Sequence, residues 1–149
     1  MIPFRPARRD DVPAIIAMLQ DDMLGQGREG ADPAHYLAAF DAMQAEGGNT
    51  LIVGVDAGDM PIATYQLTLI SGLSLRASRR AQIESVRVAA SHRGQGIGAA
   101  MIRDAQQRAR AAGCNLMQLT MNKSRANAHR FYEGMGFTGT HIGFKRNLD

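Results

Sequence analysis

The residues with the clearest chemical potential form a glycine-rich turn, RGQGIGA, that runs into a predicted helix. Glycine lets the backbone approach a ligand closely, and the first N–H groups of a helix have no partner inside it. The two features together predict an anion site whose ligand carries phosphate. The residues expected to line it are Arg93, Gly94, Gln95, Gly96, Ile97, Gly98 and Ala99.

Two common phosphate motifs fit these residues less well. A P-loop needs a lysine followed by serine or threonine after its last glycine, whereas Gly98 is followed by Ala99. The dinucleotide fingerprint accepts Gly94, Gly96 and Ala99, but it also needs an acidic residue about twenty positions later. The next predicted strand ends at Asn122 without one. The dinucleotide interpretation therefore lacks its ribose-binding residue.

The same turn resembles the acyl-CoA loop of the GNAT acetyltransferase superfamily. Its signature is Arg or Gln, two residues, Gly, one residue, then Gly or Ala, and Arg93, Gly96 and Gly98 match it. A second signature, Ala-x-x-Phe-Tyr-x-x-x-Gly-Phe, follows about thirty residues later. Its matching residues are Ala128, Phe131, Tyr132, Gly136 and Phe137. The resemblance covers essentially the whole chain.

The resemblance implies a role for several residues. Backbone groups near Val86 and Val88 would pair with the pantetheine arm of acetyl-CoA, and an N–H near Arg87 or Val88 would stabilise the oxyanion. Tyr132 would protonate the departing thiolate; alone it would be taken for a core aromatic residue beside Phe131, and the motif around it favours the functional role.

Two positions depart from the family pattern. Ala90 stands where a proline is usual, which should be tolerated. Arg125 stands where many members carry an asparagine that contacts pantetheine, and Asn122 or Asn127 could supply that contact instead.

Glu84 is the candidate general base. Alternation along a strand would place it on the same face as Val86 and Val88, and some family members carry an acidic base near this point. A salt bridge with Arg80 or Arg87 is an equally good explanation of Glu84. The four histidines are not spaced as a metal site, so we expect no metal.

The composition is that of an ordinary globular domain. The chain has 149 residues, 45% hydrophobic and 21% charged, which predicts one domain over residues 1–149. No segment is long and apolar enough to span a bilayer, and the start is no secretory signal, so we expect a cytoplasmic protein without a membrane partner. The net charge is +3 and the basic residues are scattered along the chain, so we expect no nucleic-acid partner. Cys114 is the single cysteine, so no internal disulfide can form.

The elements expected from periodicity alternate between strand and helix. The fold class is α/β with a mixed sheet of six or seven strands and about four helices, GNAT-like. A helical crossover between the strands near Gln82 and Cys114 predicts that they are parallel; in the resembled family the central parallel strands splay to hold acetyl-CoA. Expected strands cover residues 2–7, 50–55, 61–70, 79–88, 114–121 and 137–146, and expected helices 12–22, 33–45, 97–112 and 124–135.

The resemblance implies an acetyl-CoA-dependent N-acetyltransferase that acts on a primary amine of a small molecule by direct attack in a ternary complex. Alternatives are a protein lysine or N-terminal acetyltransferase, and a module that binds acyl-CoA without turnover. The acidic residues Asp21, Asp22, Glu29 and Asp32 could attract a cationic acceptor or could be helix caps and solvated charges. The segment from Phe137 to Lys145 could pair with a second copy, so a homodimer is compatible with the sequence.

Overall fold

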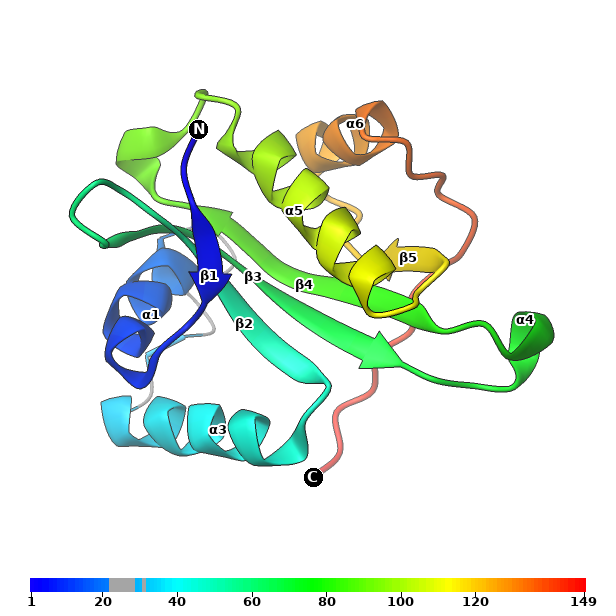
Figure 1. Cartoon of the computed structure of the whole chain (residues 1–149), viewed down its shortest axis with the longest axis horizontal. Helices are drawn as coiled ribbons and strands as arrows, with labels where there is room; N and C mark the ends of the chain where they lie inside the picture. The colour runs from blue at the N-terminus through cyan, green and yellow to red at the C-terminus, as the bar shows by residue number, and fades with distance from the viewer. Residues whose placement is uncertain (22–28, 31) are drawn as a thin grey trace.

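The computed structural model describes residues 1–21, 29–30 and 32–149, and these build one mixed sheet (Figure 1). In this part of the chain the sheet has five strands in the order β1-β2-β3-β4-β5. Neighbours are antiparallel except β4 and β5, which are parallel as the helical crossover predicted. The strands are β1 (Phe4–Pro6), β2 (Asn49–Val55), β3 (Pro61–Ile70), β4 (Arg80–Val88) and β5 (Leu116–Leu119).

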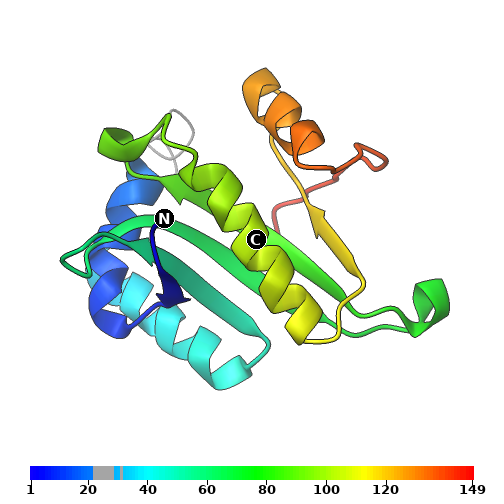
Figure 2. The same ribbon diagram turned by 45° about the horizontal axis from the view of Figure 1, so that its top comes forward.

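Helices cover both faces of this sheet, with α1 and α3 on one side and α5 on the other (Figures 1 and 2). Asp32 begins α3 by accepting a hydrogen bond from the Ala34 N–H at 2.9 Å, as expected of a helix cap. In the described residues no helix combines the length and the apolar character needed to cross a membrane. The helices are α1 (Val12–Gln20), α3 (Pro33–Glu46), α4 (Ser74–Ala77), α5 (Ile97–Ala111) and α6 (Ala126–Gly134).

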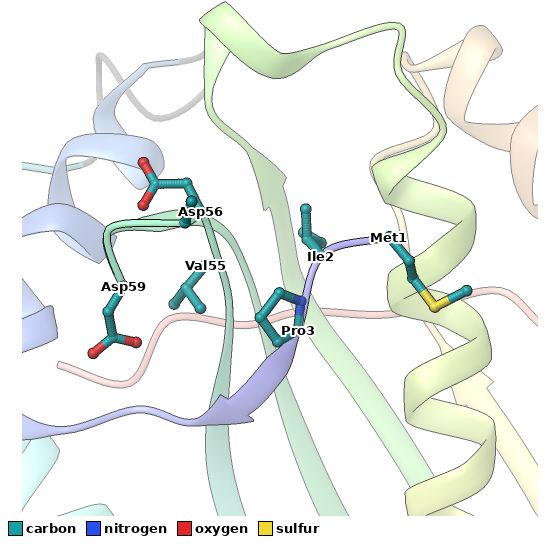
Figure 3. Close-up of a pocket in the computed structure, with 7 residues that line it drawn as sticks. Met1, Ile2, Pro3, Val55, Asp56 and Asp59 are labelled. Atoms are coloured by element: carbon teal, nitrogen blue, oxygen red, sulfur yellow. The ribbon is translucent and has the colours of Figure 1, made fainter.

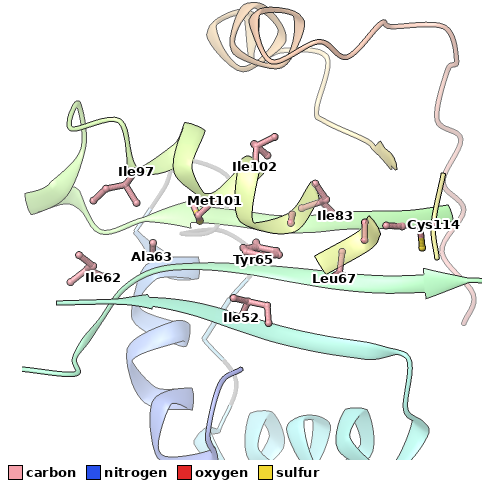
Figure 4. Close-up of a cluster of buried hydrophobic side chains, with 13 residues drawn as sticks. Ile52, Ile62, Ala63, Tyr65, Leu67, Ile83, Ile97, Met101, Ile102 and Cys114 are labelled. Carbon is pink, nitrogen blue, oxygen red and sulfur yellow. The ribbon is translucent and has the colours of Figure 1, made fainter. Parts of the chain in front are cut away.

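Each face of the sheet has its own hydrophobic core. On β2, Ile52 packs toward α5 while its neighbour Val53 packs toward α1 and α3, as alternation along a strand requires. The α5 core (Figure 4) is formed by Ile52, Ile62, Ala63, Tyr65, Leu67, Ala81, Ile83, Ile97, Met101, Ile102, Ala105, Ala109 and Cys114. Cys114 is buried there, as expected of a small apolar residue.

A polar contact joins the buried face of β3 to α5. The hydroxyl of the fully buried Tyr65 donates to Asp104 Oδ2 at 2.5 Å, and Arg108 Nε donates to the same oxygen at 2.7 Å. Arg108 also donates to the Phe4 carbonyl, so β1 is connected as well. Burial, reinforced by the Asp104 carboxylate, raises the pKa of Tyr65 far above its ordinary value.

An ion network joins β1, the start of α1 and the β2–β3 turn. Arg5 contacts Asp11 at 2.7 Å and Asp59 at 2.9 Å, and Asp59 also contacts Arg8 at 2.8 Å. Burial by itself raises the pKa of Asp11, but hydrogen bonds from Arg5 and from the Arg8 N–H outweigh it and hold the pKa below its ordinary value. The network thus stabilises the charged form of a buried carboxylate.

A cavity of about 430 Å³ lies beside this network, between residues 1–3 and the β2–β3 turn (Figure 3). Asp56 and Asp59 are its charged lining residues. Asp56 accepts hydrogen bonds from the N–H groups of Gly58 and Met60, and Asp59 is held by Arg5 and Arg8. Both carboxylates of this cavity therefore have structural partners, in the turn or on β1 and the start of α1.

Three predicted boundaries need correction. The strand predicted over residues 137–146 is not formed, so the sheet of the described residues has five strands rather than six or seven. A strand needs a hydrogen-bonding neighbour, and its residue pattern alone does not provide one. The strand predicted over residues 114–121 is shorter and is limited to β5, Leu116–Leu119. The first helix was predicted to end near Asp22 and ends at Gln20; Asp22 itself lies outside the described residues.

Candidate functional site

The parallel ladder between β4 and β5 ends while β4 continues. Arg80 to Ile83 pair with Leu116 to Leu119, and no further β5 pairing follows in the described chain although β4 extends to Val88. On its other side β4 stays paired with β3 as far as Val88, opposite Ala63. The two parallel strands therefore separate over the last five residues of β4, as the family resemblance implied.

Backbone groups of Val86 and Val88 face this separation. The Ala89 N–H donates to the Ile62 carbonyl at 2.8 Å, so the backbone N–H and C=O of Ala89 point toward β3. The backbone N–H and C=O of Val88, the residue before it, therefore point away from β3. The Val86 and Val88 carbonyls accept instead from side chains, Arg87 at 2.9 Å and Arg93 at 3.2 Å. The N–H and C=O of one residue in an antiparallel strand point to the same side, so two amide groups are presented where β5 has left.

A β-bulge at Ser85 changes the face that Glu84 occupies. Glu84 pairs with Gln66, whereas Arg87 pairs with Thr64, so two residues of β4 lie opposite the single residue between them on β3. Ser85 accordingly has a left-handed backbone, with φ of 54°. Val86 and Val88 pack on the α5 core.

Glu84 lies on the opposite face from these valines. It shares that face with Gln66, which lines a cavity under α1 and α3, and it accepts a hydrogen bond from Gln82 at 2.6 Å. The prediction that Glu84 shares a face with Val86 and Val88 is therefore wrong, because strict alternation fails across the bulge.

The glycine-rich turn presents the first N–H groups of α5. Gly94 and Gly96 have left-handed φ values of 75° and 79°, and a Cβ at either position would meet open space. The first helical hydrogen bond runs from the Ala100 N–H to the Gly96 carbonyl at 3.1 Å. The preceding N–H groups, those of residues 97–99, consequently have no bond within the helix, which is the arrangement that an anion site at a helix start requires.

Gly98 contributes differently, through packing. A Cβ there would lie 3.3 Å from Phe131 Cζ, so the absence of a side chain lets α6 approach α5 closely. The two signature segments predicted from sequence, around residues 98 and 131, therefore meet in space.

Arg93 fastens the turn to its surroundings. Its guanidinium donates to the Val88 carbonyl at 3.2 Å and to the Asp21 carbonyl at 3.1 Å, and it lies 3.5 Å from Asp21 Oδ2. Arg93 thus ties the end of β4 to the residue that follows α1. Gln95 contributes a long contact, at 3.5 Å, to the Ser91 carbonyl.

Tyr132 lies half-buried between two phenyl rings. Its ring meets Phe131 edge-on at a centroid distance of 5.1 Å and Phe137 at 5.9 Å. Burial raises the pKa of Tyr132 above its ordinary value, while the positive charges of Arg125 and Arg87 partly offset that rise. The phenol therefore keeps its proton at neutral pH, as a general acid must.

The two asparagines proposed as replacements for the missing family asparagine are engaged in local structure. Asn122 Oδ1 accepts from the Ser124 N–H at 2.9 Å and from the Ser124 hydroxyl at 2.6 Å. Asn127 Oδ1 accepts from Arg130. The Asn122 oxygen thus stabilises the turn before α6, and the Asn127 oxygen pairs with a residue within α6. None of these hydrogen bonds uses the side-chain amide nitrogen of either asparagine.

The acidic residues near α1 and α3 prove to have structural partners. Asp32 caps α3, Glu29 accepts from the Tyr36 hydroxyl at 2.7 Å, and Asp21 contacts Arg93. Asp22 lies outside the described residues. Caps and local pairs therefore account for the described members of this group, as the more ordinary of the two explanations proposed.

Sequence reasoning missed a cavity of about 140 Å³ between the sheet, α1 and α3. Thr64, Gln66 and Ser85 provide its polar floor, and its walls are apolar. The left-handed Ser85 has no sequence signal because serine is not a residue that demands this conformation. The apolar walls of the cavity are formed by Val12, Ile15, Ile16, Leu19, Tyr36, Ala39, Phe40, Met43 and Leu51.

In the described part of the chain no group of three or more His, Cys, Asp or Glu could hold a metal.

Comparison with known proteins agrees with this geometry. The sequence profile of the Acetyltransferase (GNAT) family matches residues 13–137. A solved structure of a protein named as a transcriptional regulator from Bacillus halodurans C-125 is 38% identical, with a TM-score of 0.94 over 99% of this chain and 100% of that one. A protein from Clostridium acetobutylicum named as a predicted acetyltransferase, solved with acetyl-CoA, shares the fold, with a TM-score of 0.73 and 18% identity over 99% of this chain and 97% of that one.

A curated relative gives a more local match. The aminoalkylphosphonate N-acetyltransferase of Salmonella typhimurium is 37% identical over 67 residues, which are 45% of this chain and 44% of that protein. The match therefore spans less than half of that relative's length. Because the family profile covers most of the chain, and the separated strands, glycine turn and α6 aromatic residues occur together, the chain belongs to the GNAT acetyltransferase family.

Proposed function

We propose that this protein is an acetyl-CoA-dependent N-acetyltransferase that acts on a small primary amine by direct attack in a ternary complex. One observation carries the proposal: the separated end of β4 presents the backbone of Val86 and Val88 beside the open helix start at Gly96. Membership of the GNAT family, whose enzymes use acetyl-CoA, supports it.

The residues present fit acetyl-CoA. The N–H groups at the start of α5, from residue 97 onward, suit its pyrophosphate, and the glycines before them leave room for it. The outward amides of Val86 and Val88 suit the pantetheine amides, which need both a donor and an acceptor. In this proposal Arg93 positions the turn, and Arg87, Gln95, Ala99, Asn122, Asn127 and Phe131 remain candidate contact residues.

Bound acetyl-CoA would supply a thioester whose carbonyl carbon a neutral amine can attack. A backbone N–H near Val88 would stabilise the oxygen as it gains charge. Tyr132 would hold a proton for the departing sulfur, since its raised pKa keeps the phenol protonated. Glu84 would accept the amine proton, directly or through water, from the face of the sheet that carries α1 and α3.

The acceptor would approach from that same face, where the cavity floored by Thr64, Gln66 and Ser85 lies. Amines to be tried first are aminoalkylphosphonates, because the curated relative carries that name. Simple alkylamines, amino acids and lysine peptides complete the panel, and turnover of the peptides in preference to small amines would favour the protein-acetylating alternative.

The direct test is release of free CoA thiol, measured for each amine with the wild type and with Tyr132→Phe. We expect turnover for at least one amine and a fall in kcat of about 100- to 1,000-fold in the variant, with unchanged affinity for acetyl-CoA. Tyr65→Phe is the matched control, because its hydroxyl is committed to Asp104 inside the core. Equal turnover by Tyr132→Phe and wild type would refute the acid role.

A second candidate is a regulator that binds acyl-CoA without turnover. It is favoured by the name of the Bacillus halodurans protein, which matches this chain over nearly its whole length. Binding of acetyl-CoA with no thiol release for any amine would support this alternative. Thiol release that requires Tyr132 would exclude it as the complete account.

The proposal also includes the setting in which the enzyme acts. We infer a single catalytic domain over residues 1–149 that works in the cytoplasm on acetyl-CoA and an amine, with neither nucleic acid nor membrane as a partner. The scattered charge of +3 supports the part that concerns nucleic acid.

A further inference from the structure

The cavity beneath α1 and α3 has apolar walls above a small polar floor. These two helices lie together on one side of the sheet (Figures 1 and 2). The cavity volume of about 140 Å³ is close to that which holds one benzene ring in a protein interior. An apolar group of that size would therefore gain free energy by leaving water for this cavity.

The polar residues of the floor commit hydrogen-bond donors to the protein. The Thr64 hydroxyl donates to the Ile52 carbonyl at 3.0 Å, and the Gln66 side-chain nitrogen donates to Asn49 Oδ1 at 2.9 Å. Within the described residues, neither the Thr64 hydroxyl oxygen nor Gln66 Oε1 accepts a hydrogen bond. Both residues therefore offer acceptor oxygens, which suit a ligand that carries N–H groups.

Carboxylates stand at two sides of the cavity. Tyr36, on the wall formed by α3, donates its hydroxyl to Glu29 Oε2 at 2.7 Å and accepts from the Gly30 N–H at 3.2 Å. Glu29 thus brings a negative charge to the α3 side. Glu84 brings another to the edge of the floor, where it directly precedes the lining residue Ser85 on β4.

No cation of the lining balances these carboxylates. None of the described residues that line the cavity is a lysine, arginine or histidine. Arg87 pairs with Thr64 in the sheet, but it lies outside the lining and its guanidinium donates to the Val86 carbonyl at 2.9 Å. An acidic group in this cavity would lose water without gaining a positive partner from the lining, which costs free energy. A protonated amine, by contrast, is attracted by both carboxylates.

We propose that this cavity holds the body of the acceptor, so that the acceptor is a primary amine with one compact apolar group and no acidic group, as in phenethylamine. This inference rests on the proposed function and names the acceptor of that reaction. The ring would lie between α1 and α3, with the amine at the floor, toward Glu84. Attack forms the amide C–N bond and breaks the thioester C–S bond, while Glu84 takes the amine proton and Tyr132 gives its proton to the sulfur.

The test compares three amines that share an aminoethyl unit and differ in the group attached to it. Phenethylamine carries a phenyl ring, ethylamine a hydrogen and aminoethylphosphonate a phosphonate. Thiol release at saturating acetyl-CoA gives kcat/KM for each, expressed per concentration of unprotonated amine. We expect phenethylamine to exceed ethylamine by about 10- to 100-fold through burial of the ring, and aminoethylphosphonate to fall below ethylamine. A kcat/KM for aminoethylphosphonate equal to or above that for phenethylamine would overturn the inference and leave the transferase function standing.

Ala39→Phe narrows the cavity from α3. Ala39 lines the cavity yet is exposed, so a larger side chain there does not disturb the core. We expect the KM for phenethylamine to rise about 10-fold or more, while kcat/KM for ethylamine changes less than about twofold. Ala38→Phe is the matched control, because Ala38 is an exposed neighbour on the same helix outside the lining. Equal KM values for phenethylamine in the two variants would also overturn the inference.

Calorimetric titration of phenethylamine into the protein saturated with CoA separates this inference from the proposed function. Binding that Ala39→Phe weakens and Ala38→Phe does not would support the ligand class even without thiol release, an outcome that would refute the transferase function alone. Absence of phenethylamine binding to the wild type would overturn the inference, whatever the turnover of other amines.

Discussion

Glu84 and Tyr132 illustrate how far one residue's role depends on its backbone. Glu84 lies on β4, where that strand separates from β5, and Tyr132 lies on α6, the helix that follows β5. Tyr132 sits on the side of the α5 core, whereas the bulge at Ser85 turns Glu84 to the face of α1 and α3. An acid and a base on opposite sides of a bound thioester would suit amine attack from one side and thiolate departure on the other.

Replacement of Glu84 by glutamine tests the base assignment. We expect Glu84→Gln to lower kcat about 100-fold while acetyl-CoA affinity stays unchanged, because the variant retains the shape but cannot accept the amine proton. Thiol release at saturating amine measures the effect. Glu133→Gln, an exposed glutamate on α6 that pairs with His129, is the control. Full turnover by Glu84→Gln would assign proton removal to another group or to water.

At the scale of elements, the contact between β3 and α5 holds the helix whose first turn carries the glycine site. Tyr65→Phe removes the hydroxyl that donates to Asp104 while Arg108 continues to pair with that carboxylate. We expect the free energy of unfolding to fall by about 1–2 kcal/mol, measured by urea denaturation. An unchanged midpoint would show that the buried hydrogen bond contributes nothing to holding α5 on the sheet.

The network at the start of α1 should make stability depend on acid pH. Asp11 has a folded-state pKa below its unfolded value of about 3.9, so its contribution is present above that pH and is lost as pH falls through the folded pKa. Asp11→Asn should therefore lower the free energy of unfolding by about 2 kcal/mol at pH 7, with the difference shrinking below pH 4. Urea titrations at several pH values measure this.

The control for Asp11 is Asp41→Asn. Asp41 also pairs with an arginine, Arg9, but both side chains of that pair are more than half exposed. Water screens such a pair, so its loss should change stability little at any pH. Equal effects of the two substitutions would contradict the importance given to burial of Asp11.

The elements that could be predicted are those whose pattern is local. The residue spacing of α5, the turn at residues 56–59 and the parallel crossover all follow from periodicity and turn chemistry, and the structure contains them. The bulge at Ser85 could not be predicted, because a left-handed serine depends on how β3 and β4 pair. The strand predicted over residues 137–146 was wrong for a related reason: its pattern is present, but no strand of the described residues pairs with it.

At the scale of the whole molecule, the site is assembled from segments distant in sequence. The turn at residues 93–98, the end of β4 and the aromatic pair of α6 meet because β5 runs parallel to β4 and then separates from it. Both signature segments could be identified from sequence by resemblance, whereas their contact at Gly98 and Phe131 is a finding of the structure. The acceptor side could not, since the cavity under α1 and α3 depends on the packing of two helices.

The most direct test of this account is a calorimetric titration of acetyl-CoA into the wild type, Gly96→Glu and Gly113→Glu. Gly96 and Gly113 flank opposite ends of α5 with φ of 79° and 80°, and a Cβ at either meets open space, so the backbone strain is matched. Only Gly96→Glu places a carboxylate at the helix start proposed to hold the pyrophosphate. Loss of two charge-assisted hydrogen bonds there should weaken binding about 100-fold or more.

The account predicts that the wild type and Gly113→Glu bind acetyl-CoA equally and that Gly96→Glu binds it about 100-fold more weakly or not at all. Equal binding by all three proteins, or binding by none, would contradict the assignment of the glycine-rich turn as the acyl-CoA site.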